Sequence, residues 1–397
     1  MLPQLYWGVL RVLAGTLCTA ALLAAPKPVH FRERLIATGL QGGYQVVAAD
    51  LNRDGRPDLI ALASRMDELA WYENPSWRRH VIADGLKRMI NLAVWDTDGD
   101  GIPEIVLAHD FENRAKQSIG TVSVLRSQGD PREPWKVAEI DRIPTSHRIR
   151  WADIRGDGRK VAINSALTGP NVNAPEDRAP TPLVFYDPED WMRRDISGTP
   201  EAPADEGVVH GIWVIDWDSD GREEILTASF LGIHLFKLGR DERWSKKRIV
   251  AGDTSPWPKG GSSDVAVGTL QGRRFLASIE PWHGNQVVVY REEKGMWRRQ
   301  VIDTTLVDGH TILTADFNGD GRDEIVTGFR GEGRSVHIYH ANSGNGGKWT
   351  RQTLDSGGIA AAACTTADFD GDGRPDVACI GAATANLKVY ENRGGLP

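Results

Sequence analysis

A nine-residue acidic pattern recurs along this chain and restricts the folds open to it. The pattern is D-x-[DN]-x-D-G-x-x-[DE], and it occurs five times in 397 residues, each time between similar apolar segments. A motif that returns together with its flanking segments indicates a repeat architecture. Its acidic and amide residues are Asp50, Asn52, Asp54 and Asp58; Asp96, Asp98, Asp100 and Glu104; Asp216, Asp218, Asp220 and Glu224; Asp316, Asn318, Asp320 and Glu324; and Asp368, Asp370, Asp372 and Asp376.

The spacing of each copy predicts a binding loop for a hard cation. Oxygen-bearing side chains alternate, a glycine stands at the sixth position and a carboxylate closes the loop at the ninth, which is a donor set suited to calcium. An EF-hand loop instead closes with Glu at position twelve between two helices, so it does not fit. We therefore expect up to five structural Ca²⁺ ions, which stabilise the fold by relieving repulsion among the acids.

Four β-strands accompany each copy of the pattern. One apolar segment precedes the acidic loop, as in Thr311–Ala315, and another follows it, as in Ile325–Gly328, so the loop joins two strands of a hairpin. A third strand follows, as in Val336–Tyr339, and a fourth begins with tryptophan, as in Trp349–Leu354. Four strands in a period of about fifty residues are typical of a β-propeller blade.

The number of blades follows from the intact and the degenerate copies together. Two further segments, Asp153–Gly158 and Val267–Gly272, keep the strand pattern but lack the full acid set, which brings the count to seven blades. The chain ends on a third strand, Leu387–Tyr390, while Phe31–Ile36 near its start resembles a fourth strand. We predict an all-β, seven-bladed β-propeller with four antiparallel strands per blade. The N-terminal strand closes the last blade, and residues 26–397 form one domain.

The amino-terminal segment predicts export. Residues 1–25 contain a single basic residue, an apolar run of about twelve residues and small residues before Pro26, which is the pattern of a cleaved signal peptide and is too short to span a bilayer. We therefore expect a secreted protein, periplasmic or extracellular. The formal net charge is −7 and no basic stripe is present, so nucleic acid is not an expected partner.

Two cysteines lie on the first two strands of the last blade. If the hairpin is centred on Asp372, Cys364 lies opposite residue 380 rather than Cys379, and the two side chains point to opposite faces of the sheet. The sequence therefore favours two buried thiols over a disulfide.

Three histidines share one position in the repeat. His147, His210 and His310 each stand six residues before the first acid of their loop. The first strand of a blade runs along the channel and ends at the ion loop, so these histidines start their strands on the face opposite the ions. Tyr44 and Ala362 hold the same position in other blades.

Residues of the returning strands belong to the same face. Glu280 and Arg330 follow the second strands of two neighbouring blades, and His283 lies in the turn after Glu280. Two long segments, Thr168–Pro182 and Ser197–Gly207, also emerge there, and we expect them to wall or cover the channel mouth. Blades three to six thus offer a contiguous arc of candidate site residues.

Several phrases resemble known families. The acidic loops and blade strands resemble FG-GAP/VCBS repeats. Four short segments resemble the propeller portion of the aldos-2-ulose dehydratases: His210-Gly211, Gly309-His310, the run from Glu280 to Asn285 and the run from Trp71 to Asn74. This resemblance implies elimination of water from a keto-sugar such as anhydrofructose. The cupin domains of the fungal enzyme have no counterpart in this chain, so its isomerase step is not expected.

The predicted arc contains the groups that such an elimination needs. Removing water next to a carbonyl requires an electrophile, a base and an acid. We expect a divalent metal held by His210, His310 and Glu280 as the electrophile. Proton transfer is assigned to His283 or His147. The sugar oxygens would be oriented by Arg330 or Arg150.

Two other functions fit the sequence. One is a secreted, non-catalytic recognition or adhesion propeller, in which the loops are scaffolding and the channel mouth binds glycan or protein. The other is a polysaccharide lyase acting on a uronate chain, whose carboxylates the arginines would neutralise. The chain contains no Gly-x-Ser-x-Gly elbow, phosphate loop or dinucleotide fingerprint, which argues against serine hydrolase, nucleotide and nicotinamide chemistry.

Overall fold

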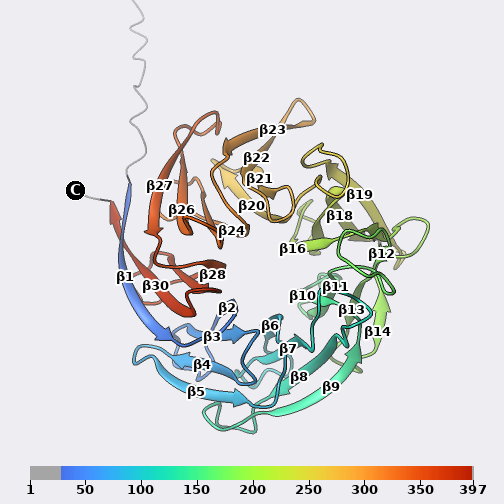
Figure 1. Cartoon of the computed structure of the whole chain (residues 1–397), viewed down its shortest axis with the longest axis vertical. Coiled ribbons are helices and arrows are strands. Elements are labelled where there is room, and N and C mark those ends of the chain that lie inside the picture. Colours follow the sequence, from blue (N-terminus) through green and yellow to red (C-terminus); the bar gives the residue numbers. More distant parts are fainter. Residues whose placement is uncertain (1–27, 396–397) are drawn as a thin grey trace, which may run out of the picture.

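The computed structural model describes residues 28–395, which form a ring of seven four-stranded antiparallel sheets around a central channel (Figure 1). This confirms the predicted seven-bladed β-propeller. One further two-stranded sheet pairs β12 (Pro180–Thr181) with β15 (Asp205–Glu206).

The blades are numbered here from the first acidic loop, with their strands given from the channel outward. Blade one contains β2 (Gly43–Ala49), β3 (Asp58–Ala63), β4 (Leu69–Glu73) and β5 (Arg78–Ala83); blade two, β6 (Asn91–Trp95), β7 (Glu104–His109), β8 (Thr121–Arg126) and β9 (Lys136–Arg142); blade three, β10 (Ser146–Ala152), β11 (Val161–Ala166), β13 (Leu183–Tyr186) and β14 (Arg193–Asp195).

The later blades repeat this order. Blade four contains β16 (Val209–Ile215), β17 (Glu224–Ser229), β18 (Gly232–Leu238) and β19 (Trp244–Val250); blade five, β20 (Asp264–Leu270), β21 (Arg273–Glu280), β22 (Gln286–Glu293) and β23 (Met296–Asp303); blade six, β24 (Gly309–Ala315), β25 (Glu324–Phe329), β26 (Ser335–Ala341) and β27 (Trp349–Ser356); blade seven, β28 (Ala361–Ala367), β29 (Asp376–Gly381), β30 (Asn386–Gly395) and β1 (Val29–Thr38).

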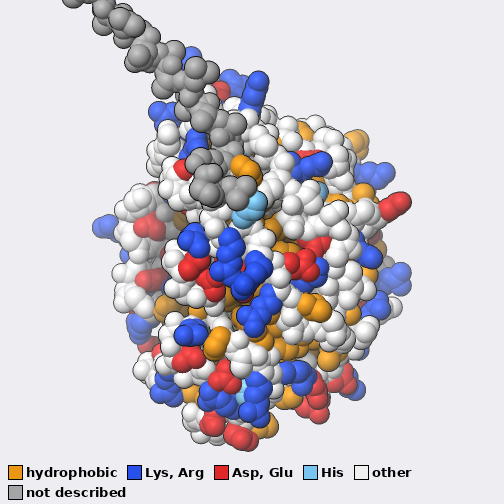
Figure 2. All heavy atoms as spheres, turned by 90° about the vertical axis from the view of Figure 1, so that its left-hand side faces the viewer, with side chains coloured by type: hydrophobic (Ala, Val, Ile, Leu, Met, Phe, Trp, Pro, Cys, Tyr) orange, Lys and Arg blue, Asp and Glu red, His pale blue; other side chains and the backbone are white. Residues whose placement is uncertain are grey.

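Burial along the strands explains their sequence patterns. The second strands β3, β7, β11, β17, β25 and β29 are buried at every position. They pack on both faces against neighbouring blades, so they are continuous apolar runs rather than alternating ones. The outer strands are largely exposed and charged, and Figure 2 shows acidic and basic side chains next to one another on the side of the ring formed by β1 and β27.

The ring closes as the sequence predicts. The N-terminal strand β1 pairs antiparallel with β30, with Arg32 opposite Glu391 and Arg34 opposite Val389. In Figure 1 the first and last strands of the chain lie side by side in one blade. Closure in this way leaves blade seven with the same number of strands as the others, so its sheet has no missing outer strand.

The prediction for the cysteines was wrong. Cys364 lies opposite Cys379 in the β28–β29 register, and the two form a disulfide. Ala367 pairs with Asp376, so the loop encloses an even number of residues and the hairpin is centred between residues 371 and 372. This half-residue difference from the expected centre places both sulfur atoms on the same face of the sheet.

The two long segments of blades three and four fold against each other. Their short strands β12 and β15 pair, and Leu167 and Val208 pack with Phe230 against Trp257 and Trp282. No helix within residues 28–395 is long and apolar enough to cross a membrane. The predicted signal peptide, residues 1–25, lies outside the described residues.

Candidate functional site

The acidic loops share one backbone geometry on one face of the ring. In all five, the first Asp accepts a hydrogen bond from the N–H of the glycine at the sixth position, for example from Gly101 to Asp96 at 2.9 Å. The closing acid accepts one from the N–H of the second loop residue, for example from Thr97 to Glu104 at 2.8 Å. These bonds gather the carboxylates, and in blades two, four and seven three acids of the loop bring oxygens within 4.8 Å of one another.

The loop of blade four differs because a single ammonium group contacts three of its acids. The ammonium of Lys237, on β18, lies 2.6 Å from Asp218, 2.9 Å from Asp220 and 2.9 Å from Glu224. These three carboxylates are the ones that a calcium ion would use. The oxygen donors of the other loops fit a hard cation, whereas the loop of blade four fits one only if Lys237 moves away.

The opposite face gathers the predicted histidines. His147, His210 and His310 start β10, β16 and β24, and all three are at most 3% exposed. The ring centroid of His210 lies 5.0 Å from that of His147 and 5.1 Å from that of His310. His283 completes the group, with its ring centroid 4.9 Å from that of His210. Residues from four separate blades thus meet at the channel axis.

Three of these imidazoles are oriented by hydrogen bonds at Nδ1. His210 donates to the carbonyl oxygen of Ser263 at 3.1 Å, and His310 donates to that of Ala362 at 2.6 Å. Nδ1 of His283 lies 3.1 Å from the carboxylate of Asp308. When Nδ1 donates, Nε2 keeps its lone pair. Nε2 of His310 has no hydrogen-bond partner among the described residues, although it is buried.

This arrangement fits a metal ion with three histidine ligands. The ligand atoms of His210, His283 and His310 lie within 4.8 Å of one another. Three imidazoles held at their far nitrogens by carbonyls or a carboxylate, with a position left open, are the usual protein contribution to a catalytic zinc-type site. Burial is the main cause that holds the pKa of His210 and of His310 well below the usual range, so both rings are neutral and available as ligands.

A tyrosine and an arginine that the sequence analysis did not assign adjoin this cluster. The hydroxyl of Tyr44 lies 2.9 Å from Nε2 of His147, and Nη1 of Arg148 lies 3.3 Å from the same atom. Since an arginine can only donate, Nε2 of His147 is the acceptor. Tyr44 occupies the same repeat position as the three histidines. This shared position is the sequence feature that could have identified it as a site residue.

The structure does not bring Glu280 to the histidine cluster. Its carboxylate is fully buried and accepts hydrogen bonds from Ser262, from Tyr290 at 2.7 Å and from Arg299 at 2.9 Å. The turn that follows β21 carries His283 to the place expected for Glu280. The expected metal group of His210, His310 and Glu280 is therefore corrected to His210, His310 and His283.

The two predicted arginines lie at different depths. Arg330 forms a two-pronged ion pair with Asp308, at 2.9 and 3.0 Å, beside His283. Arg150 lies further along the channel and donates to Asn91 at 3.3 Å and to the carbonyl oxygen of Ile149 at 2.7 Å. Arg330 thus adjoins the histidine cluster directly, whereas Arg150 faces the channel beneath it.

A cavity of about 690 Å³ opens on the histidine face. Its lining includes Tyr44, Phe111 and Asp308, together with Arg65 and Arg330. Tyr44 contacts His147 and Asp308 contacts His283, so a molecule in this cavity reaches the edge of the cluster. The volume suits a small ligand such as a monosaccharide.

Comparisons with known proteins relate the chain to a sugar-acting enzyme. The family model described as the aldos-2-ulose dehydratase beta-propeller domain matches residues 119–293, and that of the FG-GAP-like repeat matches residues 50–107 and 316–379. The chain is 25% identical over 406 residues to aldos-2-ulose dehydratase of Phanerodontia chrysosporium, which covers 88% of this chain and 43% of that protein. It therefore spans less than half the length of this relative.

A solved structure also matches the chain along most of its length. It is that of an Agrocybe aegerita lectin described as recognising non-reducing terminal N-acetylglucosamine, with 13% sequence identity and a TM-score of 0.49. The match covers 88% of this chain and 86% of the lectin chain.

Proposed function

We propose that this seven-bladed β-propeller, which matches the FG-GAP-like repeat and resembles the propeller portion of aldos-2-ulose dehydratase, is a metal-assisted dehydratase acting on a keto-sugar such as anhydrofructose. The observation that carries the proposal is the convergence of His210, His283 and His310 on one point, where Nδ1 of His210 and of His310 faces a backbone carbonyl oxygen and leaves Nε2 with its lone pair. An enclosed set of unprotonated imidazoles is suited to a divalent metal.

The residues around the cluster have the chemistry for an elimination. A metal bound by the three imidazoles would act as a Lewis acid toward the sugar carbonyl. His147 takes the proton from the carbon next to that carbonyl, because its Nε2 is an acceptor. The electron pair of the broken C–H bond forms a C=C bond as the neighbouring C–O bond breaks. Tyr44 gives a proton to the departing hydroxyl, which leaves as water, so no oxidant or reductant is required.

The acidic loops serve this proposal as scaffolding. Calcium bound in them would hold the inner hairpins of the intact blades in place, and the export expected from residues 1–25 would supply calcium at the concentrations that such loops need. The disulfide between Cys364 and Cys379 agrees with an oxidising compartment.

A recognition propeller is the second candidate, and the accessible cavity on the histidine face supports it. The two functions differ in what the cluster must bind. A recognition protein has no need for a buried group of three imidazoles with free acceptor nitrogens, whereas a Lewis-acid site does.

The experiment combines metal analysis with a reaction assay. The purified protein is analysed for metals and then incubated with anhydrofructose, while ultraviolet absorbance reports the conjugated product. We expect one transition metal per chain and a rising absorbance, and we expect His210→Ala/His310→Ala to lose both. His30→Ala is the matched control, because His30 is exposed on β1. A wild-type protein that takes up no transition metal and leaves the absorbance flat would refute the dehydratase.

A further inference from the structure

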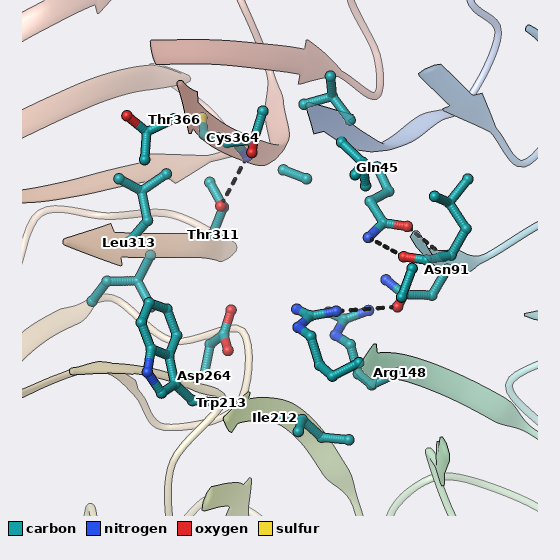
Figure 3. Close-up of a pocket in the computed structure, with 18 of the residues that line it drawn as sticks. Gln45, Asn91, Arg148, Ile212, Trp213, Asp264, Thr311, Leu313, Cys364 and Thr366 are labelled. Carbon is teal, nitrogen blue, oxygen red and sulfur yellow. Dashed lines mark hydrogen bonds between the residues drawn. The ribbon is translucent and has the colours of Figure 1, made fainter. Parts of the chain in front are cut away.

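The channel beneath the histidines contains two arginines that form no ion pair with a described residue. Arg148 and Arg150 are both on β10, and both line a cavity of about 460 Å³ inside the ring. Arg148 is only 5% exposed. Figure 3 shows Arg148 beside Asn91 on one side of this cavity, with Asp264 on another side.

Neither guanidinium has a carboxylate within 4.0 Å in the part of the chain that the structure describes. Arg148 hydrogen-bonds to the ring and carbonyl oxygen of His147 and to the ring of His210, and it lies over the ring of Tyr44. Arg150 contacts only Asn91 and the carbonyl oxygen of Ile149. Arg330, by contrast, is paired with Asp308 at 2.9 Å. A buried charge without a partner is costly, so this pair is expected to have an anionic partner that the protein itself does not supply.

Asp264 is the acidic residue that lines the cavity, and it cannot balance both arginines. Its carboxylate accepts a hydrogen bond from the N–H of Val265 and has no cation within 4.0 Å among residues 28–395. Burial raises the pKa of Asp264 to about 6, so near neutral pH it carries at most one negative charge. Lys160 also lines the cavity, but Glu223 pairs with it at 3.2 Å. The cavity therefore keeps an excess positive charge.

We propose that this cavity binds the carboxylate of an acidic sugar, with Arg148 and Arg150 as its principal partners. A guanidinium presents two parallel N–H groups that match the two oxygens of a carboxylate. Arg148 lies 3.3 Å from His147 and 3.5 Å from His210, so the bound carboxylate lies next to the imidazoles. The cavity volume accommodates a sugar ring.

This proposal narrows the substrate class of the histidine site, and its catalytic meaning rests on the dehydratase proposed above. Neutralising a carboxylate makes the proton on the adjacent carbon easier to remove, because the negative charge that develops is offset. The substrate class would then include keto-sugars that also carry a carboxylate group. The binding itself does not depend on catalysis, so the two proposals can fail separately.

The test compares two sugars that differ in one group. D-glucuronate and D-glucose are titrated calorimetrically into the full-length protein at neutral pH and low salt. We expect glucuronate to bind at least tenfold more tightly, and its affinity to fall as salt is added. Arg148→Met and Arg150→Met should each lower the affinity for glucuronate at least tenfold. Arg298→Met, at an exposed position on β23, should leave it unchanged.

Further measurements distinguish carboxylate binding from a folding defect and from a nonspecific anion site. Arg148→Lys and Arg150→Lys retain the charge and should keep part of the glucuronate affinity, which separates a binding role from a folding defect. Titration with acetate tests for an adventitious small-anion site, and acetate binding as tightly as glucuronate would count against sugar recognition. Equal affinities for glucose and glucuronate, or unchanged glucuronate binding in both Met variants, would overturn the proposal. If glucuronate binding persists in His210→Ala/His310→Ala and the wild-type protein shows no reaction in the assay above, this site is supported and the dehydratase alone is rejected.

Discussion

The Nε2 atoms of His210 and His283 face each other at 3.2 Å. In each ring the other nitrogen has partners of its own: Nδ1 of His210 faces the carbonyl oxygen of Ser263, and Nδ1 of His283 lies 3.1 Å from the carboxylate of Asp308 and 3.3 Å from Arg330. Two lone pairs at this distance repel each other unless a cation or a proton lies between them. Because burial lowers the pKa of both imidazoles, a metal ion is better suited to this position than a proton.

Asp308→Asn tests the support of the third ligand. The carboxylate of Asp308 fixes the ring of His283 and also pairs with Arg330. The amide of asparagine has the same shape but no negative charge, so it holds the imidazole of His283 less firmly. We expect the affinity for the transition metal to fall about 10- to 100-fold, as measured by competition with a chelating dye.

Two controls separate this effect from the loss of the ion pair. Arg330→Met breaks the same pair but leaves the bond between Asp308 and His283, and it should retain most of the metal affinity. Asp190→Asn changes an exposed carboxylate that is paired with Arg194, and it should have no effect. Equal metal affinities in Asp308→Asn and the wild-type protein would contradict the proposed role.

Tyr44→Phe tests the proton donor. The hydroxyl lies 2.9 Å from His147, and its removal leaves the ring packing against His310, whose centroid is 5.2 Å away. We expect kcat to fall about 10²- to 10⁴-fold, the range for the loss of general acid–base catalysis. The metal content should not change. Tyr72→Phe on β4 removes a hydroxyl elsewhere, and if it lowered kcat as much, the effect of Tyr44→Phe would be nonspecific.

The architecture could be predicted because the four-strand pattern recurs in every blade. The acidic loops, the tryptophan-led outer strands and the final third strand give the blade count and the closure. The shared register of His147, His210 and His310 also predicts that they meet, since equivalent positions of a ring lie around one axis.

The features that could not be predicted from the sequence depend on the path of single turns and on side-chain directions. Glu280 and His283 are three residues apart, and only the path of the turn after β21 decides which reaches the cluster. The disulfide depends on a half-residue difference in the register of β28 and β29. Lys237 lies 13 residues beyond Glu224, the last acid of its loop, so its contact with the acids appears only once β18 is placed.

Lys237→Met tests whether a lysine replaces the ion in blade four. The ammonium contacts Asp218, Asp220 and Glu224, and its removal leaves these acids without their internal cation. We expect the variant to bind one more Ca²⁺ per chain than the wild-type protein, as counted by equilibrium dialysis. Lys247→Met, at an exposed position on β19, is the matched control. An unchanged calcium count in Lys237→Met would show that the lysine does not block this loop.

His337 predicts how stability depends on pH. It lies on β26, 6% exposed, between Phe329 and Tyr339, with Arg351 and Asp303 as the charged groups nearby. Burial is the main cause that lowers its pKa from 6.5 to about 4, so the folded protein prefers the neutral ring. The unfolded chain takes up a proton as the pH falls below about 6.5, and the folded chain does so only near 4. The stability from this residue is therefore present above pH 6.5 and is lost as the pH falls toward 4.

Urea unfolding at pH 7 and at pH 4.5 measures this loss. A shift of one pKa unit corresponds to about 1.4 kcal/mol, so His337 alone contributes roughly 2 kcal/mol to the difference in unfolding free energy between these two pH values. Glutamine does not titrate. The unfolding free energy of His337→Gln should therefore fall between pH 7 and pH 4.5 by about 2 kcal/mol less than that of the wild-type protein. His30→Gln, at an exposed position, should follow the wild-type protein. A wild-type pH dependence in His337→Gln would mean that other groups cause the acid lability, among which buried His234, with its pKa also lowered to about 4, would be examined next.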